Sequence, residues 1–193
     1  MEKIGRNKAL IIASAKKLFS KYGFRKTTMD EIASEAGKGK SSLYYYYTSK
    51  EEVFAAVVEE ESVHLQNMIN KAIEAEQKAS EKLKAYIKTS VRSIQEMANL
   101  NEAIQNEFLS HYTIIEQIRQ KYYAQEVHTV QQILQLGMEK ESFDLPDPAF
   151  TARAVVRIMK AMEIPLRIGM PERNLDEEID KLMHMILYGI LSR

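Results

Sequence analysis

The chain contains no cysteine, so disulfide bonds, thiolate metal ligands and cysteine nucleophiles are all excluded. Its 193 residues include only seven glycines and four prolines. No stretch approaches the roughly 20 consecutive apolar residues that span a bilayer. The N-terminal segment also lacks the uninterrupted apolar core of a signal peptide. These absences favour a cytoplasmic protein.

The net charge is zero, but the charge is divided unequally along the chain. The first 50 residues carry eleven Lys and Arg against four Asp and Glu, a net charge of +7, so residues 51–193 carry −7. Such a division suggests that one end of the protein meets a polyanion. The alternative is a chance fluctuation of solvated charges.

The spacing of apolar residues predicts an all-α protein of about nine helices with no sheet. Pro165 is expected to kink or end the eighth helix, and Asp147 should cap its start at Pro148. The helices are expected near residues 4–22, 28–36, 40–47, 49–73, 79–98, 101–109, 112–140, 148–165 and 174–191.

Capping signals mark several helix starts. Thr28 with Glu31 and Ser49 with Glu52 have the spacing of a capping box, in which each side chain binds the other residue's backbone N–H. Asn174 is the expected cap of the last helix. These signals separate two short helices from a longer one that follows them.

The two short helices are joined by the sequence AGKGK and have the spacing of a helix-turn-helix. In DNA complexes of such units, residues at the N-terminus of the second helix face the base edges in the major groove. Here these residues are small or cationic: Lys38, Lys40, Ser41 and Ser42. Helix-turn-helix units also occur as packing elements, so an all-α interaction or scaffolding protein is the alternative function.

The span AKKLFSKYGFRKTTMDEIASEAGKGKSSLYYYYTSKEEVF, residues 15–54, resembles the DNA-binding domain of the TetR family of transcriptional regulators. Two departures are Lys38, where the family more often has valine or a small residue, and Tyr47, where phenylalanine is usual. The matching landmarks are Leu18-Phe19, Gly23, Thr27-Thr28, Ile32-Ala33, Ala36-Gly37, Leu43-Tyr44, Tyr47 and Lys50.

The resemblance implies a DNA-contacting role for a set of residues around the second short helix. Thr27, Thr28 and Lys50 would contact phosphates, and the lysines and serines named above would enter the major groove. Among the four tyrosines, Tyr44 and Tyr47 are expected to hold the helix onto its module, with Tyr44 still able to reach the DNA backbone. The expected DNA-binding residues are Thr27, Thr28, Lys38, Lys40, Ser41, Ser42, Tyr44, Tyr45, Tyr46 and Lys50.

The resemblance also implies a division of labour, with residues 1–50 binding DNA and residues 51–193 binding an effector and forming a dimer. The chain would then be a repressor of a palindromic operator that an unidentified small molecule releases. Aromatic and methionine side chains with polar tips are candidate effector contacts, although each of them also suits an ordinary core. The candidates are Tyr86, Met97, Phe108, His111, Tyr112, Tyr123 and Met138.

The last two expected helices each carry an apolar stripe, and the resemblance implies that they form the seam of a homodimer. A core role within one subunit competes with this interpretation. The expected interface residues are Met159, Met162, Met183, Ile186, Leu187 and Ile190.

No pattern in the sequence favours an enzyme. Glu60 with His64 and Glu107 with His111 each share a helix face, but two ligands are too few for a closed zinc site and HExxH is absent. The segment GKGKSS lacks the GxxxxGK[ST] spacing of a phosphate-binding loop and follows a helix rather than a strand. We therefore expect neither a metal nor a cofactor.

Overall fold

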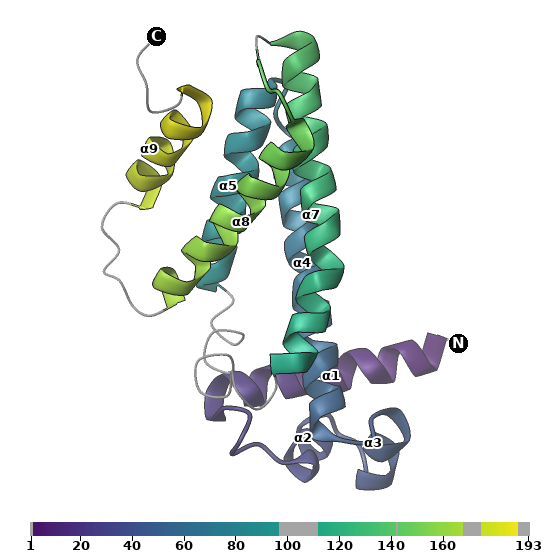
Figure 1. The fold of residues 1–193 in the computed structure, drawn as a ribbon. Coiled ribbons are helices and arrows are strands. Elements are labelled where there is room, and N and C mark those ends of the chain that lie inside the picture. The colour runs from purple at the N-terminus through teal and green to yellow at the C-terminus, as the bar shows by residue number, and fades with distance from the viewer. Residues whose placement is uncertain (1, 97–111, 142, 168–174, 189–193) are drawn as a thin grey trace. The chain divides into compact units, whose positions relative to one another are not determined.

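The computed structural model describes residues 2–96, 112–141, 143–167 and 175–188. Every regular element in these residues is a helix, as Figure 1 shows, which confirms the all-α prediction. The expected helix at 101–109 lies outside the described residues. No described helix is long and apolar enough to cross a membrane. The helices are α1 (Glu2–Tyr22), α2 (Met29–Glu35), α3 (Lys40–Tyr46), α4 (Lys50–Glu74), α5 (Ala79–Glu96), α7 (Tyr112–Lys140), α8 (Pro148–Arg167) and α9 (Leu175–Tyr188).

The described residues fall into two compact units that divide within α4 and again within α7. The first unit holds residues 2–63 and 112–120, and the second holds 64–96 and the described residues from 121 onward. The functional division expected after residue 50 stays a prediction.

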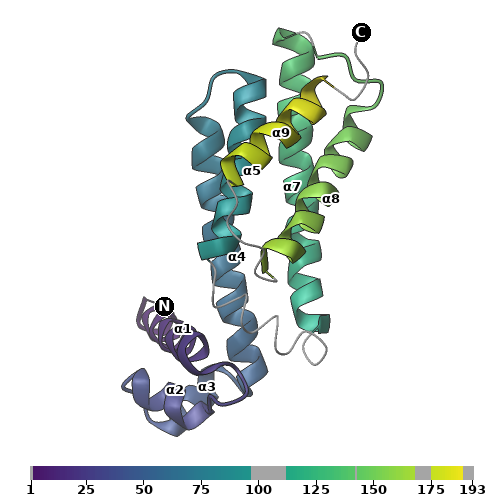
Figure 2. The same cartoon turned by 90° about the vertical axis from the view of Figure 1, so that its left-hand side faces the viewer.

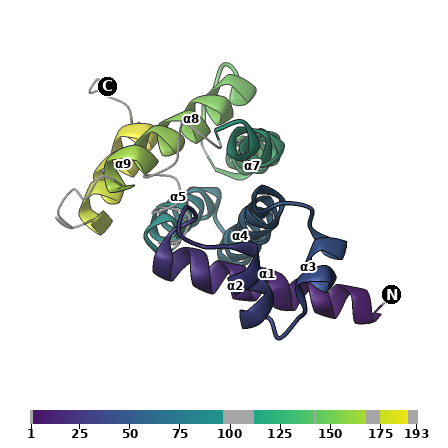
Figure 3. The same ribbon diagram turned by 90° about the horizontal axis from the view of Figure 1, so that it is seen from below.

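Three aromatic rings form the centre of the first unit. Phe19 of α1, Phe24 of the following turn and Phe54 of α4 are buried, with ring centroids between 5.2 and 5.7 Å apart. Gly23 ends α1 with a φ of 79°, a left-handed conformation that glycine adopts without strain. The chain can therefore turn back so that α2 packs on α1, as Figure 3 shows from below.

The capping signals of the first unit act largely as predicted. Thr28 and Glu31 form the complete capping box of α2. At α4 the Glu52 N–H donates to the Ser49 hydroxyl at 3.2 Å, but the Glu52 carboxylate accepts from the backbone of Thr48 instead of closing the box on Ser49. Both helix starts are thus fixed by local side chains.

The second unit packs α5 against α8 and α9, an arrangement visible in Figure 2. Its buried core consists of aliphatic side chains with Tyr86, which is also fully buried. The Asp147 carboxylate caps α8 by accepting from the Phe150 N–H at 2.8 Å, as expected. Pro165 does not end α8, which continues to Arg167. The expected cap Asn174 lies outside the described residues.

Candidate nucleic-acid interface and effector site

The turn between α2 and α3 is closed by the backbone of its own residues. The Gly37 N–H donates to the Ser34 carbonyl at 3.0 Å and the Lys38 N–H donates to the Ala33 carbonyl at 2.8 Å. This pair of bonds is a Schellman motif, and it needs the positive φ of 63° that Gly37 supplies. The motif fixes the path by which the chain enters α3 from α2.

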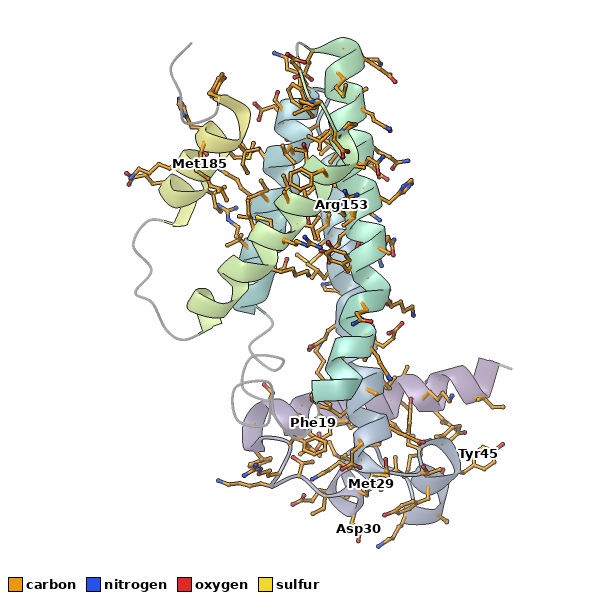
Figure 4. The ribbon with its side chains drawn as sticks, viewed as in Figure 1. Phe19, Met29, Asp30, Tyr45, Arg153 and Met185 are labelled. Carbon is orange, nitrogen blue, oxygen red and sulfur yellow. The ribbon has the colours of Figure 1, made fainter. Side chains whose placement is uncertain are left out.

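α3 has one buried face and one exposed face. Leu43 is fully buried, and Tyr46 and Tyr47, three and four residues later, pack on the same core. Ser41, Tyr44 and Tyr45 have the same spacing on the opposite face and are exposed. Figure 4 shows Tyr45 at the outside of this unit. The exposed face of α3 is therefore a short strip of hydroxyl and phenol groups.

The four tyrosines form two pairs, but they are not the predicted pairs. Tyr46 was expected to face DNA, whereas its hydroxyl accepts a hydrogen bond from the Asn7 side chain of α1 at 3.0 Å and its ring packs on the core. Tyr44, which was expected to pack, is 41% exposed. The reason is helical spacing, because residue 46 follows Leu43 by three positions and residue 44 by only one. Burial raises the pKa of the Tyr47 hydroxyl.

Lys40 is the first residue of α3 and binds an acid of α2. Its Nζ lies 2.9 Å from each carboxylate oxygen of Asp30, and both side chains are more than half exposed. The hydrogen bond to Asp30 and the attraction of its charge raise the pKa of Lys40. Lys38 and Ser42 are half-buried beside it. The residues expected in the major groove are thus gathered around one turn, with an acid among them.

Lys50, expected to bind a phosphate, is engaged within the protein. Its Nζ donates to the carbonyls of Phe24 at 2.7 Å and Thr27 at 2.8 Å, with a longer contact of 3.4 Å to Arg25. The ammonium also lies 4.3 Å from the centre of the Phe24 ring. The three donors of this group are directed at the turn before α2, so the geometry assigns Lys50 to holding that turn.

The two threonines before α2 differ in exposure. Thr27 is 1% exposed, and its hydroxyl donates to the Gly23 carbonyl at 2.8 Å. Its side chain therefore faces the interior. Thr28 is exposed at the start of α2, where its hydroxyl takes part in the capping box. Of the pair, Thr28 alone presents its side chain at the surface.

Of the seven expected effector residues, the structure describes the side chains of three, so the set stays a prediction. Tyr86 belongs to the buried core, Tyr123 is half-buried against it, and Met138 is exposed. Met97, Phe108 and His111 lie outside the described residues. Tyr112 begins α7, but its side chain is outside the description.

The second unit also contains a set of buried polar groups, of which the sequence predicted only Tyr123 as a site residue. Glu126 of α7 is 5% exposed, and its carboxylate accepts from Lys160 of α8 at 3.1 Å and from Gln66 of α4 at 3.4 Å. The hydroxyls of Ser90, Ser93 and Tyr123 are buried and lack hydrogen-bond partners among the described residues. We call the six residues Gln66, Ser90, Ser93, Tyr123, Glu126 and Lys160 the polar layer.

Helix geometry places two members of this layer at the same height in the unit. The Glu141 carboxylate binds the backbone of Ala79 and Ser80, so the end of α7 adjoins the start of α5. Ser93 is fourteen residues from Ala79 and Glu126 is fifteen residues from Glu141 along the chain, or about 21 to 22 Å at 1.5 Å per residue. Serines on helices rarely signal a site in a sequence, which explains why the serines of the layer were missed.

The expected dimer residues are divided by the structure. Met159 and Met183 are buried in the core of the second unit, and Ile186 packs against it, as the competing core interpretation holds. Met162 and Leu187 are helical, but their side chains are outside the description, as is the whole of Ile190. Among the described side chains of these two helices, the large apolar residues that are exposed are Phe150, Ile158, Met185 and Tyr188.

An open hollow of about 570 Å³ lies on the first unit, and its lining includes Glu31, the capping-box partner of Thr28. Leu18 and Tyr22 of α1, Lys26 of the following turn, and Glu31, Ser34 and Glu35 of α2 line it. Within the described part of the chain, no group of three or more His, Asp or Glu residues is arranged to hold a metal ion.

The sequence matches a known family at its N-terminus. Residues 11–57 match the sequence profile described as bacterial regulatory proteins, tetR family. A comparison with curated protein sequences gives no match.

Solved structures resemble the chain over nearly its whole length. A transcriptional regulator from Cytophaga hutchinsonii is 29% identical with a TM-score of 0.79, covering 95% of this chain and 98% of its own. A TetR/AcrR family regulator from Thermobifida fusca is 22% identical with a TM-score of 0.71, covering 96% and 98%. FadR from Bacillus subtilis, in complex with stearoyl-CoA, is 18% identical with a TM-score of 0.72, covering 95% and 99%.

The matched segment contains the whole helix-turn-helix and the first turns of α4. The described helices reproduce the fold of solved regulators that bear the family name. Residues 11–57 thus carry the sequence pattern of the tetR family of bacterial regulatory proteins, and the chain is similar in fold to solved transcriptional regulators.

Proposed function

We propose that the chain is a repressor that binds a palindromic DNA operator as a homodimer and leaves it when a small molecule binds the second unit. The observation that carries the DNA-binding part is the exposed face of α3, where Ser41, Tyr44 and Tyr45 follow Lys40 on the side opposite the core. Three further expected contacts remain in the proposal: Lys38 in the turn, Ser42 in the first turn of α3 and Thr28 at the start of α2. The side chains of Thr27, Tyr46 and Lys50 are left out because each is engaged within the unit.

Selection of bound duplexes from a random pool tests this proposal against a scaffolding role. A DNA-binding regulator should enrich one palindromic sequence, and its affinity should fall steeply with salt because bound phosphates release counterions. A scaffolding protein whose helix-turn-helix only packs should enrich nothing. Repression is proposed because it is the commoner mode in this family.

We further propose that the effector is an amphipathic molecule with a long apolar body and a hydrogen-bonding end. The hydroxyls of Ser90, Ser93 and Tyr123 are buried without a hydrogen-bond partner in the described part of the chain, on helices that form an aliphatic core, which suits such a molecule. Buried polar groups without partners are costly, so a ligand that bonds them is favoured. The stearoyl-CoA complex of the Bacillus subtilis neighbour makes a fatty acyl thioester the first class to test.

Stearoyl-CoA added to the complex with the selected duplex tests the effector class. Release of the DNA by stearoyl-CoA, with none by coenzyme A alone, is the expected result. Ser93→Ala should weaken this release while leaving DNA affinity without ligand unchanged. Equal release from the wild type and from Ser93→Ala would contradict the role of the polar layer.

For the homodimer, support comes from the exposed apolar residues of α8 and α9. Phe150, Ile158, Met185 and Tyr188 are all well exposed in the single chain. Two subunits would place two copies of α3 in successive major grooves about 34–36 Å apart. Sedimentation that finds a monomer still binding the palindromic duplex tightly would contradict the dimer.

A further inference from the structure

The ion pair between α2 and α3 lies on the exposed side of the helix-turn-helix. Asp30 is the second residue of α2 and Lys40 the first of α3, and Lys40 Nζ lies 2.9 Å from both carboxylate oxygens. Figure 4 shows Asp30 at the outside of the unit. Neither residue is needed by the core, because their side chains are 61% and 64% exposed. The pair therefore sits where an approaching DNA molecule would meet it.

The pair changes what the exposed face offers to DNA. Lys40 is the only cationic residue in the sequence of α3. While it is bound to Asp30, its charge is balanced by an adjacent carboxylate, and a nearby phosphate meets an acid as well as a cation. If Lys40 leaves Asp30 to bind a phosphate, it replaces one anionic partner by another and gains little. A guanine edge in the major groove offers two acceptors, O6 and N7, which lysine can bind together.

We propose that Asp30 is a specificity-determining residue, which holds Lys40 away from phosphates and yields it to a base edge in the correct sequence. The proposal rests on the proposed DNA-binding function. Asp30 itself contacts no base in this scheme. It lowers the affinity for random DNA more than the affinity for the operator, and so raises the ratio between them.

Removing the charge of Asp30 tests the proposal while keeping its shape. Asp30→Asn should bind a scrambled duplex about 2- to 5-fold more tightly, as expected for loss of an exposed ion pair, with a smaller gain for the duplex selected from a random pool. The salt dependence on the scrambled duplex should steepen by about one counterion per subunit. A selectivity that is unchanged or improved in Asp30→Asn would overturn the proposal.

Glu35→Gln is the matched control. Glu35 also lies on α2 and forms an exposed ion pair, but its partner is Lys17 of α1, at 2.6 Å. Both substitutions raise the net charge by one, and only Asp30→Asn releases the cation of α3. Equal loss of selectivity in the two variants would show that net charge alone acts, and would overturn the proposal.

A double substitution separates release of Lys40 from direct repulsion of DNA by Asp30. In a Lys40→Gln background, Asp30→Asn should no longer tighten binding to the scrambled duplex, because no ammonium remains to be released. A gain that persists in this background would overturn the proposal. Thermal melting should show all variants folded, since both residues are exposed. Absence of any salt-dependent duplex binding by the wild-type protein would instead overturn the proposed function, and this inference with it.

Discussion

At the scale of single residues, Lys50 shows how a surface cation can belong to the fold. Its ammonium joins the start of α4 to the carbonyls of Phe24 and Thr27 in the turn before α2. The same group lies over the Phe24 ring, which is part of the aromatic centre of the unit. The side chain thus holds the loop that positions α2.

Lys50→Met should destabilise the protein. Methionine keeps an apolar stem over Phe24 but cannot donate to the carbonyls, and hydrogen bonds to charged groups contribute about 1.5–3 kcal/mol. Because Lys50 is partly exposed, water can replace some of these hydrogen bonds in the variant, so we expect the free energy of unfolding to fall by about 1–2 kcal/mol. Urea unfolding measures it, with the exposed Lys26→Met as the control expected within about 0.5 kcal/mol of wild type. Wild-type stability in Lys50→Met together with weaker DNA binding would restore the phosphate role.

Tyr45 and Tyr46 should respond differently to loss of the hydroxyl. Tyr46→Phe removes the hydrogen bond from Asn7 and should cost about 0.5–1.5 kcal/mol of stability. Tyr45, at 76% exposure, should show no loss of stability as Tyr45→Phe but weaker binding to DNA. Thermal unfolding and duplex titration of both variants check the distinction. The reverse pattern would mean that the exposed pair has been misassigned.

At the scale of elements, the end of α7 is shaped by one close approach. A Cβ atom on Gly137 would overlap the ring of Phe143, which packs back against the helix. Glu141, which directly follows α7, caps α5: its carboxylate accepts hydrogen bonds from the backbone N–H groups of Ala79 and Ser80 and from the Ser80 hydroxyl. This segment therefore joins two helices of the second unit through packing and through a cap.

Gly137→Ala should destabilise the second unit even though alanine favours helix by about 1 kcal/mol. Displacing the Phe143 ring should cost about 1–3 kcal/mol, so a net loss is expected. Gly5→Ala in α1 is the control, since a Cβ there meets nothing within 4 Å and should stabilise by about 0.5 kcal/mol. Denaturant titration compares the two, and equal stabilisation by both substitutions would contradict the close approach.

Glu141 should make the second unit sensitive to acid. Burial alone would raise the pKa of this carboxyl, but hydrogen bonds from Ala79 and Ser80 and the charge of Lys78 outweigh it and lower the pKa below the ordinary 4.5. The charged form is thus favoured by folding, and its contribution is complete above pH 4.5 and lost as the pH falls below that value. The stability difference between wild type and Glu141→Gln should therefore shrink from pH 7 to pH 3. A difference that stays constant over this pH range would contradict the cap.

At the scale of the whole molecule, the features that the sequence predicts are those set by residues close together along the chain, such as helix caps and helix ends. The capping box of α2, the end of the first helix at residue 22 and the cap at Asp147 are local features, and the structure confirms each one. The partners of Lys40 and Lys50 are ten or more residues away, and nothing local indicates them. The same holds for Glu126, whose partners Gln66 and Lys160 lie 60 and 34 residues away in the sequence.

Selectivity for DNA tests the central claim, that the exposed face of α3 reads the operator. The measurement is the ratio of affinities for the selected and scrambled duplexes, for wild type and for a variant with Ser41→Ala and Tyr45→Ala. Both residues are exposed, so the variant should stay folded. Base contacts contribute about 1–3 kcal/mol of discrimination each, so the account predicts a ratio at least about 5-fold lower in the variant. An unchanged ratio in a folded variant would contradict the claim.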